Sequence, residues 1–410
     1  MRSPVQSSAA ETLEHPPLPW GPASRYRPPL RIALFSGNYN CIRDGANRAL
    51  NRLVGHALDR GHAVRVYSPT VAEPAFAPAG DLVSVRSIPI PGRSEYRLTT
   101  GLPAAIAADV RAFAPDLIHV SAPDPLGARA QVLARELGVP VVASLHTRFE
   151  TYLDYYGLGF LRGWAERWLA TFYGRSDLVL TPSPQVAREL GAAHPGLDVG
   201  VWSRGVDPAE FHPRLRDERW RLAHGIAPDE VVVLFFGRLV NEKGLGDYAA
   251  AVEQARRMGC PVRALVVGDG PAGAWFRSQI ADAVFTGHLT GAELGRAVAS
   301  ADVLLNPSTT EAFGNVTLEA MAAGLAVVAA EVPSTRVLIR DGEQGLLAPA
   351  GDVRRYAAAI DHLCTNAELR HALGRRAWTA SLHYRWPEIL DGVLASYRRV
   401  CARADQRRAA

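Results

Sequence analysis

The sequence predicts an α/β protein with two Rossmann-like domains, each built on a doubly wound parallel sheet. Short apolar runs alternate with segments of helical periodicity along most of the chain, and this order is typical of parallel strands joined by helical crossovers. The alternation pauses once, at residues 202–221, where charged residues, proline and glycine accumulate as in a linker. Because ligands of open α/β sheets bind beyond the carboxyl ends of the strands, we expect both halves to face a cleft.

The chain has 410 residues, which is enough for two domains of ordinary size. Residues 1–29 are rich in proline and lack the apolar segment of a signal peptide, so we expect a disordered tail. The first sheet domain is predicted over residues 30–207 and the second over residues 208–380. Residues 381–410 form a final helical segment.

Hydrophobic periodicity assigns the elements of each half. In the first half, strands are expected at 30–36, 63–67, 117–121, 141–145 and 177–181, with helices at 46–60, 103–113, 126–137, 160–174 and 184–191. In the second half, strands are expected at 231–236, 263–267, 283–286, 302–306, 325–329 and 345–347, with helices at 244–257, 271–280, 292–299, 315–323, 353–373 and 386–402.

The composition restricts the class of protein. Hydrophobic residues make up 48% and charged residues 21% of the chain, as in globular proteins. The 45 basic residues nearly balance the 41 acidic ones, so nucleic-acid binding is not indicated, although an anionic substrate or membrane surface is compatible with the net charge of +4. The four cysteines lack metal-site or disulfide spacing, which indicates a reducing compartment. No apolar run has the length of a membrane span, and we expect a cytoplasmic protein.

Two carboxylates flank a glycine turn at residues 311–319. Glu311 and Glu319 are separated by seven residues, and the turn Phe313–Asn315 between them places Asn315 as the expected N-cap of a helix. Glu319 lies among apolar residues and needs hydrogen-bond partners such as sugar or ribose hydroxyls, while the start of the helix suits a phosphate. The alternative is that Glu311 caps a turn and Glu319 reaches the surface of an amphipathic helix.

A second strand-to-helix loop carries Arg238 and Lys243. Two cations at the carboxyl end of a strand suit a diphosphate, although a solvated loop is the alternative. Gly268 lies in a further strand-to-helix turn, where a glycine lets a ligand approach the backbone. This turn lacks the G-x-G-x-x-G spacing, which disfavours a dinucleotide-dependent dehydrogenase. The sequence contains no Asp-x-Asp triad, so a metal clamp for the diphosphate is not expected.

The first half offers fewer candidates. His146 follows a strand and is either structural or a residue of the cleft. Asp44 precedes Gly45 at the start of the first helix, where it caps the helix or contacts an acceptor hydroxyl. Arg204 lies close to the expected hinge and is within reach of the cleft. The helix at 160–174 has an aromatic face that is either a core stripe or a contact with an anionic membrane.

These segments together resemble retaining glycosyltransferases of family 4, which have the GT-B fold. The resemblance covers about residues 30–400. Its most specific elements are EAFGNVTLE (311–319) for the E-x7-E motif, GRLVNEKG (237–244) for the diphosphate loop and RGVDPAEFHP (204–213) for the interdomain signature. VVGDGP (266–271) and FTGHL (285–289) resemble segments that line the nucleotide, and RWPEILDGVLASYRRV (385–400) resembles the helix that crosses back to the first domain.

The resemblance implies transfer of a hexose from a nucleoside-diphosphate sugar, with retention of configuration and with neither a metal nor a further cofactor. Arg238 and Lys243 would hold the diphosphate, Glu319 the ribose and Glu311 the sugar hydroxyls, with His146 beside the reacting centre. The implied donor site comprises Arg204, Gly237, Arg238, Lys243, Gly268, Gly287, Glu311, Phe313, Gly314, Asn315 and Glu319. The implied acceptor site comprises Asp44, Gly45 and His146.

The first-domain loop reads DGANRAL where the family commonly has two glycines. This variant and the segment HTRFETYLDYYGLGFL (146–161) resemble bacterial members that act on lipid or lipid-linked acceptors, including those that use GDP-mannose. The expected reaction is therefore transfer of mannose from GDP-mannose to a lipid or glycan acceptor, with peripheral contact at the inner face of the cytoplasmic membrane. The alternatives are a UDP-sugar donor, a nucleotide-sugar epimerase of the same fold, and a sugar-nucleotide-binding protein without activity.

Overall fold

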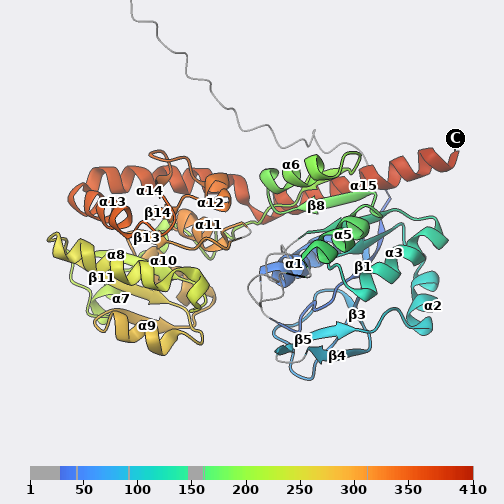
Figure 1. The fold of residues 1–410 in the computed structure, drawn as a ribbon, viewed down its shortest axis with the longest axis horizontal. Coiled ribbons are helices and arrows are strands. Elements are labelled where there is room, and N and C mark those ends of the chain that lie inside the picture. Colours follow the sequence, from blue (N-terminus) through green and yellow to red (C-terminus); the bar gives the residue numbers. More distant parts are fainter. Residues whose placement is uncertain are drawn as a thin grey trace, which may run out of the picture.

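A computed structural model describes residues 28–42, 45–90, 93–145, 160, 162–311 and 313–409. The expected tail lies largely outside these residues, as do Asp44 and His146. The chain forms two α/β domains that lie side by side (Figure 1). The predicted α/β class with two doubly wound parallel sheets is confirmed.

The N-terminal domain contains a seven-stranded sheet in the order β3-β2-β1-β6-β7-β8-β9, in which every pairing is parallel. Its strands are β1 (Arg31–Phe35), β2 (Ala63–Ser68), β3 (Asp81–Ser84), β6 (Leu117–Val120), β7 (Val141–Ser144), β8 (Leu178–Thr181) and β9 (Val199–Val201). Its helices are α1 (Gly45–Asp59), α2 (Ala104–Phe113), α3 (Pro125–Leu137), α5 (Arg162–Tyr173) and α6 (Pro184–Ala193). The sequence did not predict β3, β9 or the antiparallel hairpin of β4 (Ser87–Ile90) and β5 (Arg93–Thr99).

The C-terminal domain contains a six-stranded parallel sheet in the order β12-β11-β10-β13-β14-β15. Its strands are β10 (Val231–Phe236), β11 (Val262–Val267), β12 (Val284–Gly287), β13 (Val303–Asn306), β14 (Ala326–Ala330) and β15 (Gly345–Ala348). Its helices are α7 (Glu218–Ala223), α8 (Leu245–Arg257), α9 (Gly273–Gln279), α10 (Gly291–Ala299), α11 (Asn315–Ala322), α12 (Pro333–Leu338), α13 (Val353–Thr365) and α14 (Ala367–Ser381). Apolar residues fill both faces of each sheet.

The predicted helix at 353–373 is wrong, because two helices occupy this range. α13 ends at Thr365 and α14 begins at Ala367. Asn366 lies between them, and its side chain accepts a hydrogen bond from the backbone N–H of Leu369 at 2.9 Å. Asn favours such caps because its side chain replaces a missing backbone partner, and this cap lets the chain change direction.

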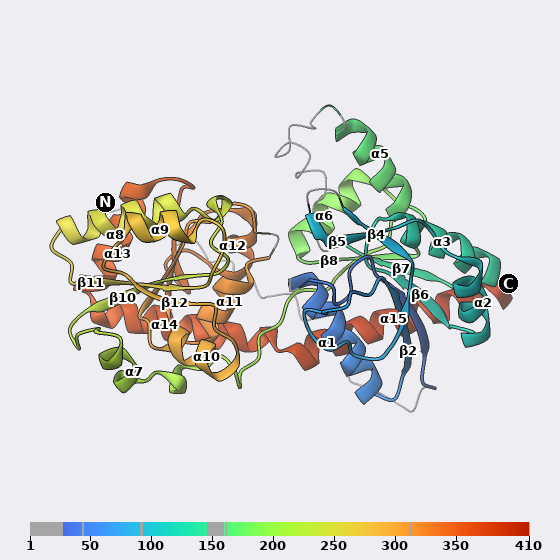
Figure 2. The same ribbon diagram turned by 90° about the horizontal axis from the view of Figure 1, so that it is seen from below.

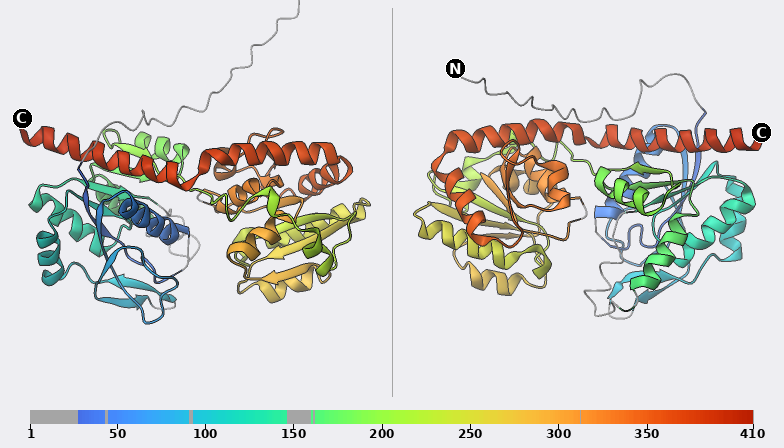
Figure 3. Two further views of the ribbon diagram at one scale, coloured as in Figure 1. Left: turned by 180° about the vertical axis from the view of Figure 1, so that it is seen from behind. Right: turned by 45° about the horizontal axis from the view of Figure 1, so that its top comes forward.

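The final helix α15 (Trp386–Ala409) joins the two domains along one side (Figure 3). It packs into the N-terminal core with α1, through Leu390, Leu394 and Tyr397 among others. The Tyr397 hydroxyl hydrogen-bonds Nδ1 of buried His119, whose Nε2 lies 2.9 Å from Oγ of Ser144. Burial lowers the pKa of His119 to about 3, so this histidine is a neutral structural group.

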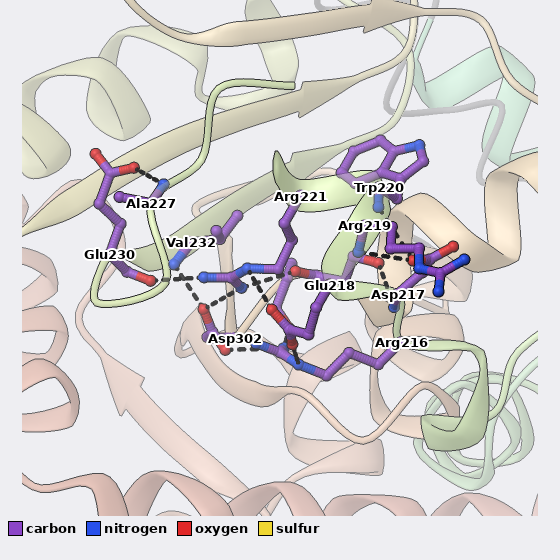
Figure 4. Close-up of polar contacts among 12 residues, drawn as sticks. Arg216, Asp217, Glu218, Arg219, Trp220, Arg221, Ala227, Glu230, Val232 and Asp302 are labelled. Atoms are coloured by element: carbon purple, nitrogen blue, oxygen red, sulfur yellow. Dashed lines mark hydrogen bonds and ion pairs between the residues drawn. The ribbon is translucent and has the colours of Figure 1, made fainter. Parts of the chain in front are cut away.

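The predicted linker at 202–221 is partly folded, because its last residues belong to α7. Figure 4 shows how α7 is fastened to the sheet: Asp302 accepts from Arg216 and Arg221 at 2.9 Å each, and from the backbone N–H of Val232 at 2.8 Å. Arg221 is 2% exposed, so its guanidinium is buried and this mostly buried carboxylate is its counter-ion. The network lies at the amino ends of β10 and β13 and stabilises the sheet from the edge opposite the candidate site.

Candidate functional site

Three glycines form the edge of the C-terminal sheet where β10, β11 and β12 end. Gly237, Gly268 and Gly287 have φ angles of 142°, 140° and 73°. The N–H of Gly268 donates to the carbonyl of Gly287 at 2.9 Å, and a Cβ added to Gly268 would lie 1.9 Å from the carbonyl oxygen of Gly237. Only glycine fits here, and the result is an edge of bare backbone that a ligand can approach closely.

The loop after β10 places Lys243 beside Glu311. Leu239 anchors this loop with a side chain 2% exposed, and Gly244 (φ 73°) packs against Pro307, which belongs to the loop that leads to Glu311. Nζ of Lys243 lies 2.7 Å from Oε1 of Glu311, with exposed fractions of 26% and 17% for the two side chains. The residue predicted to bind the diphosphate, Lys243, and the residue predicted to bind the sugar, Glu311, therefore lie side by side.

A cavity of about 190 Å³ opens between these loops. It is lined by Phe235, Phe236, Gly237, Arg238, Lys243, Leu304, Leu305, Asn306, Glu311, Asn315 and Val316. Arg238 is exposed and makes no ion pair with any residue in the described ranges. The cavity thus joins two cations, a carboxylate and a helix start, which is the chemistry that binds a phosphorylated ligand bearing hydroxyl groups.

The start of α11 differs from the prediction. Gly314, with φ of 96°, occupies the N-cap position, and Asn315 is the first helical residue. The expected capping role of Asn315 is therefore wrong, because the glycine turn provides the left-handed geometry and Asn315 follows it. Oδ1 of Asn315 is buried and has no hydrogen-bond partner among the described residues. Phe313 is 4% exposed and its ring lies 5.9 Å from that of Tyr384, so its side chain anchors the turn in the core.

Glu319 lies one turn along α11 from Asn315 and is partly buried. Burial raises the pKa of its carboxyl group to about 8. The positive charges of Arg48 and Arg52 oppose this increase, whereas the carboxylates of Glu210 and Glu311 add to it. Glu319 therefore titrates near neutral pH.

The N-terminal domain reaches this site through α1. A Cβ added to Gly45 would lie 2.8 Å from Nδ2 of Asn315, so the predicted acceptor-side and donor-side residues are neighbours. Arg204 is 5% exposed and its guanidinium lies 6.0 Å from the Trp202 ring centroid, within the hinge. The roles of Asp44 and His146 stay predictions, since both residues lie outside the described ranges.

The sequence interpretation did not identify Arg48, Arg52 or Asp124. The two arginines are four residues apart on α1, a spacing that signals a shared helix face. Asp124 precedes proline at the start of α3 and accepts from the N–H of Gly127 at 2.7 Å, which is a recognisable N-cap pattern. Burial raises the pKa of Asp124 to about 6, and the residue lies against Gly37 at the carboxyl edge of the N-terminal sheet.

Among the described residues, no group of His, Cys, Asp and Glu side chains is arranged to hold a metal ion. The charged groups that converge on the site are instead the arginine and lysine of the β10 loop and the two glutamates around α11.

Comparisons with known proteins agree with this arrangement. Residues 230–366 match the family described as glycosyl transferases group 1, and residues 43–210 match glycosyltransferase family 4. The chain is 33% identical to a GDP-mannose-dependent alpha-mannosyltransferase of Mycolicibacterium smegmatis, over 93% of this chain and 100% of that protein. It is 31% identical to the sulfoquinovosyl transferase SQD2 of Arabidopsis thaliana, over 87% of this chain and 71% of that protein.

A solved structure shares the fold. The sucrose-phosphate synthase of Thermosynechococcus elongatus superimposes with a TM-score of 0.72 at 20% identity, over 91% of this chain and 99% of that one. The two sheets, the donor-side motifs and the sequence relatives lead to one assignment. The chain belongs to glycosyltransferase family 4 and is a hexosyltransferase with the GT-B fold.

Proposed function

We propose that this enzyme transfers mannose from GDP-mannose to a hydroxyl group of a lipid or glycan acceptor, with retention of the anomeric configuration. The Lys243–Glu311 pair inside the cavity carries this proposal, because it joins a phosphate-binding cation to a carboxylate that accepts hydrogen bonds from sugar hydroxyls. The mannosyltransferases at 31–33% identity support the choice of donor.

Each site residue then has a role in the reaction. The bond between the sugar C1 and the diphosphate oxygen breaks, and the acceptor oxygen bonds to C1 on the same face. The acceptor proton passes to an oxygen of the leaving diphosphate. Arg238 and Lys243 stabilise the charge that grows on this leaving group, and Glu311 stabilises positive character on the sugar. Closure of the two domains excludes water, which would otherwise hydrolyse the donor.

No divalent metal takes part in this proposal, because two fixed cations already face the diphosphate position. Full activity in EDTA is the expected result. Activity that is lost in EDTA and restored by Mg²⁺ or Mn²⁺ would contradict this part.

The donor is tested by thermal shift with GDP, UDP and their sugars, followed by transfer assays. A ligand at 100 times its dissociation constant stabilises the fold by about 2.7 kcal/mol. GDP and GDP-mannose should stabilise the protein more than the uridine compounds do, and mannose should appear on the acceptor. Stronger stabilisation by UDP-sugars would show that the donor is a UDP-sugar. Release of an epimerised donor without transfer would show that the enzyme is an epimerase.

The acceptor is proposed to be reached at the inner face of the cytoplasmic membrane through the start of α5. Phe160, which precedes α5, and Trp164 in its first turn are 80% and 61% exposed, whereas Phe172 near the far end is 3% exposed. Figure 2 shows α5 at the periphery of the N-terminal domain. The helix is therefore a core element at one end and an exposed aromatic surface, suited to a lipid interface, at the other.

Within the described residues, every helix is too short or too polar to cross a membrane. Membrane contact would accordingly be peripheral. In flotation with anionic vesicles, the protein should bind and Phe160→Ser/Trp164→Ser should bind less. Equal flotation of the wild type and the double variant, or no effect of lipid charge at low salt, would contradict the proposed membrane contact.

A further inference from the structure

Two helices from different domains meet at the site. α1 and α11 lie on the facing edges of the two domains (Figure 1), and Gly45 contacts Asn315 where both helices begin. Arg48 and Arg52 follow Gly45 at positions i+3 and i+7, on the face of α1 that contains Gly45. Glu319 follows Asn315 at position i+4, on the corresponding face of α11. Both arginines are near enough for their positive charges to act on Glu319.

Arg52 is also held at the hinge. Its guanidinium lies 5.2 Å from the ring centroid of Trp386, and Nη1 lies 3.9 Å from Oδ2 of Asp207. Trp386 in turn fills the space beside Gly205, where an added Cβ would lie 2.6 Å from the indole. These contacts place the guanidinium of Arg52 beside Asp207 and Trp386, which belong to the two segments that connect the domains.

The charges around Glu319 come from three further elements. Glu210 in the hinge segment and Glu311 in the donor loop are negative, and Lys243 is paired with Glu311. The positive charges of Arg48 and Arg52 favour the ionised form of Glu319. Burial opposes ionisation, so the charge on Glu319 depends on the N-terminal domain.

We propose that Arg48 and Arg52 are positioning residues that favour the carboxylate form of Glu319, so that it can accept hydrogen bonds from the donor ribose. This inference rests on the proposed ribose-binding role of Glu319. Separation of the domains removes the arginines and weakens the donor site, and by thermodynamic reciprocity a bound donor favours the closed arrangement. The acceptor domain thus controls donor affinity through charge.

The test is isothermal titration with GDP between pH 6.5 and 9, using wild type, Arg48→Gln/Arg52→Gln and Glu319→Gln. Affinities are expressed relative to Glu319→Gln at the same pH, which cancels the titration of the nucleotide. The wild-type ratio should rise with pH and level off above about pH 8. In the double arginine variant the rise should move up by about one pH unit, which makes binding about tenfold weaker at pH 7 and nearly normal at pH 9.

Two controls complete the design. Arg111→Gln/Arg257→Gln removes the same charge from exposed positions that pair with Glu136 and Glu253, and should leave the pH profile unchanged. With 2′,3′-dideoxy-GDP, which lacks the ribose hydroxyls, the profile should be flat for every variant.

The outcomes separate the inference from the proposed function. If the double arginine variant is weakened equally at every pH, or is weakened further in the Glu319→Gln background, the arginines do not act through Glu319 and the inference is overturned. If Glu319→Gln binds GDP as wild type does at every pH, Glu319 does not hold the ribose and the proposed role fails with it.

Discussion

Lys243 and Glu311, 68 residues apart in sequence, form an ion pair of 2.7 Å in the lining of the donor cavity. A diphosphate has to compete with Glu311 for the lysine, and when it succeeds the carboxylate becomes available to the sugar. Donor binding and the orientation of the sugar-binding carboxylate are therefore coupled.

Lys243→Ala and Arg238→Ala should each lower turnover about 10²- to 10³-fold, because each removes a cation from the leaving diphosphate. Affinity for guanosine, which carries no phosphate, should stay unchanged. Steady-state rates together with titrations of guanosine and GDP measure both effects. Wild-type turnover in either variant would make this loop merely structural.

Gly268→Ala should abolish nucleotide binding while the domain stays folded, because the new Cβ would lie 1.9 Å from the Gly237 carbonyl oxygen. Gly287→Ala is the matched control: its φ is also positive, but an added Cβ has no atom within 4 Å. It should therefore lose less affinity. Circular dichroism and GDP titration test the pair, and equal affinities in the two variants would show that the contact between the loops is unimportant.

Asp302→Ala should destabilise the protein by about 3–5 kcal/mol, because it leaves the buried guanidinium of Arg221 without its mostly buried carboxylate partner (Figure 4). Glu218→Ala removes an exposed carboxylate that pairs with Arg216 and Arg221, and it should lower the free energy of unfolding by less than about 1 kcal/mol. Urea unfolding measures both changes in the free energy of unfolding. Similar values would show that the network is not a buried ion pair in solution.

The sequence was sufficient for most strands of the two large sheets and for the donor motif, since apolar runs and glycine turns are local signals. It was not sufficient for the helix at 353–373, where the capping asparagine outweighed a continuous helical pattern. The hairpin β4–β5 escaped prediction because Pro89 and the charged residues of β5 weaken the strand pattern. The approach of Arg52 to Glu319 could not be predicted, since it depends on how two domains dock and no local pattern encodes that geometry.

Glu311→Gln should lower turnover without a loss of GDP affinity, because the amide keeps the hydrogen-bonding capacity but not the charge that stabilises the sugar in the transition state. Single-turnover rates and GDP titration separate the two effects. The loss of the ion pair frees Lys243, so a modest gain in GDP affinity is also expected. A loss of GDP affinity with normal turnover would reverse the roles of Glu311 and Glu319.

Glu319→Gln should make the protein more stable at pH 8 than the wild type, and equally stable near pH 4. Burial raises the pKa of Glu319 from its ordinary value of 4.5 to about 8. Between these two values the unfolded chain has lost a proton that the folded chain retains, so wild-type stability falls as the pH rises through this window and levels off above about pH 8. Glutamine cannot ionise, and the variant avoids this loss.

The expected gain at pH 8 is on the order of 2 kcal/mol, since water still reaches part of the side chain. Urea unfolding from pH 4 to pH 9 without nucleotide measures it, with the exposed Glu253→Gln as the control that should follow the wild type. A constant difference between Glu319→Gln and wild type at all pH values would mean that Glu319 titrates in its ordinary range. The carboxylate would then need no help from α1, and the coupling between the domains would have to arise from contacts other than this charge.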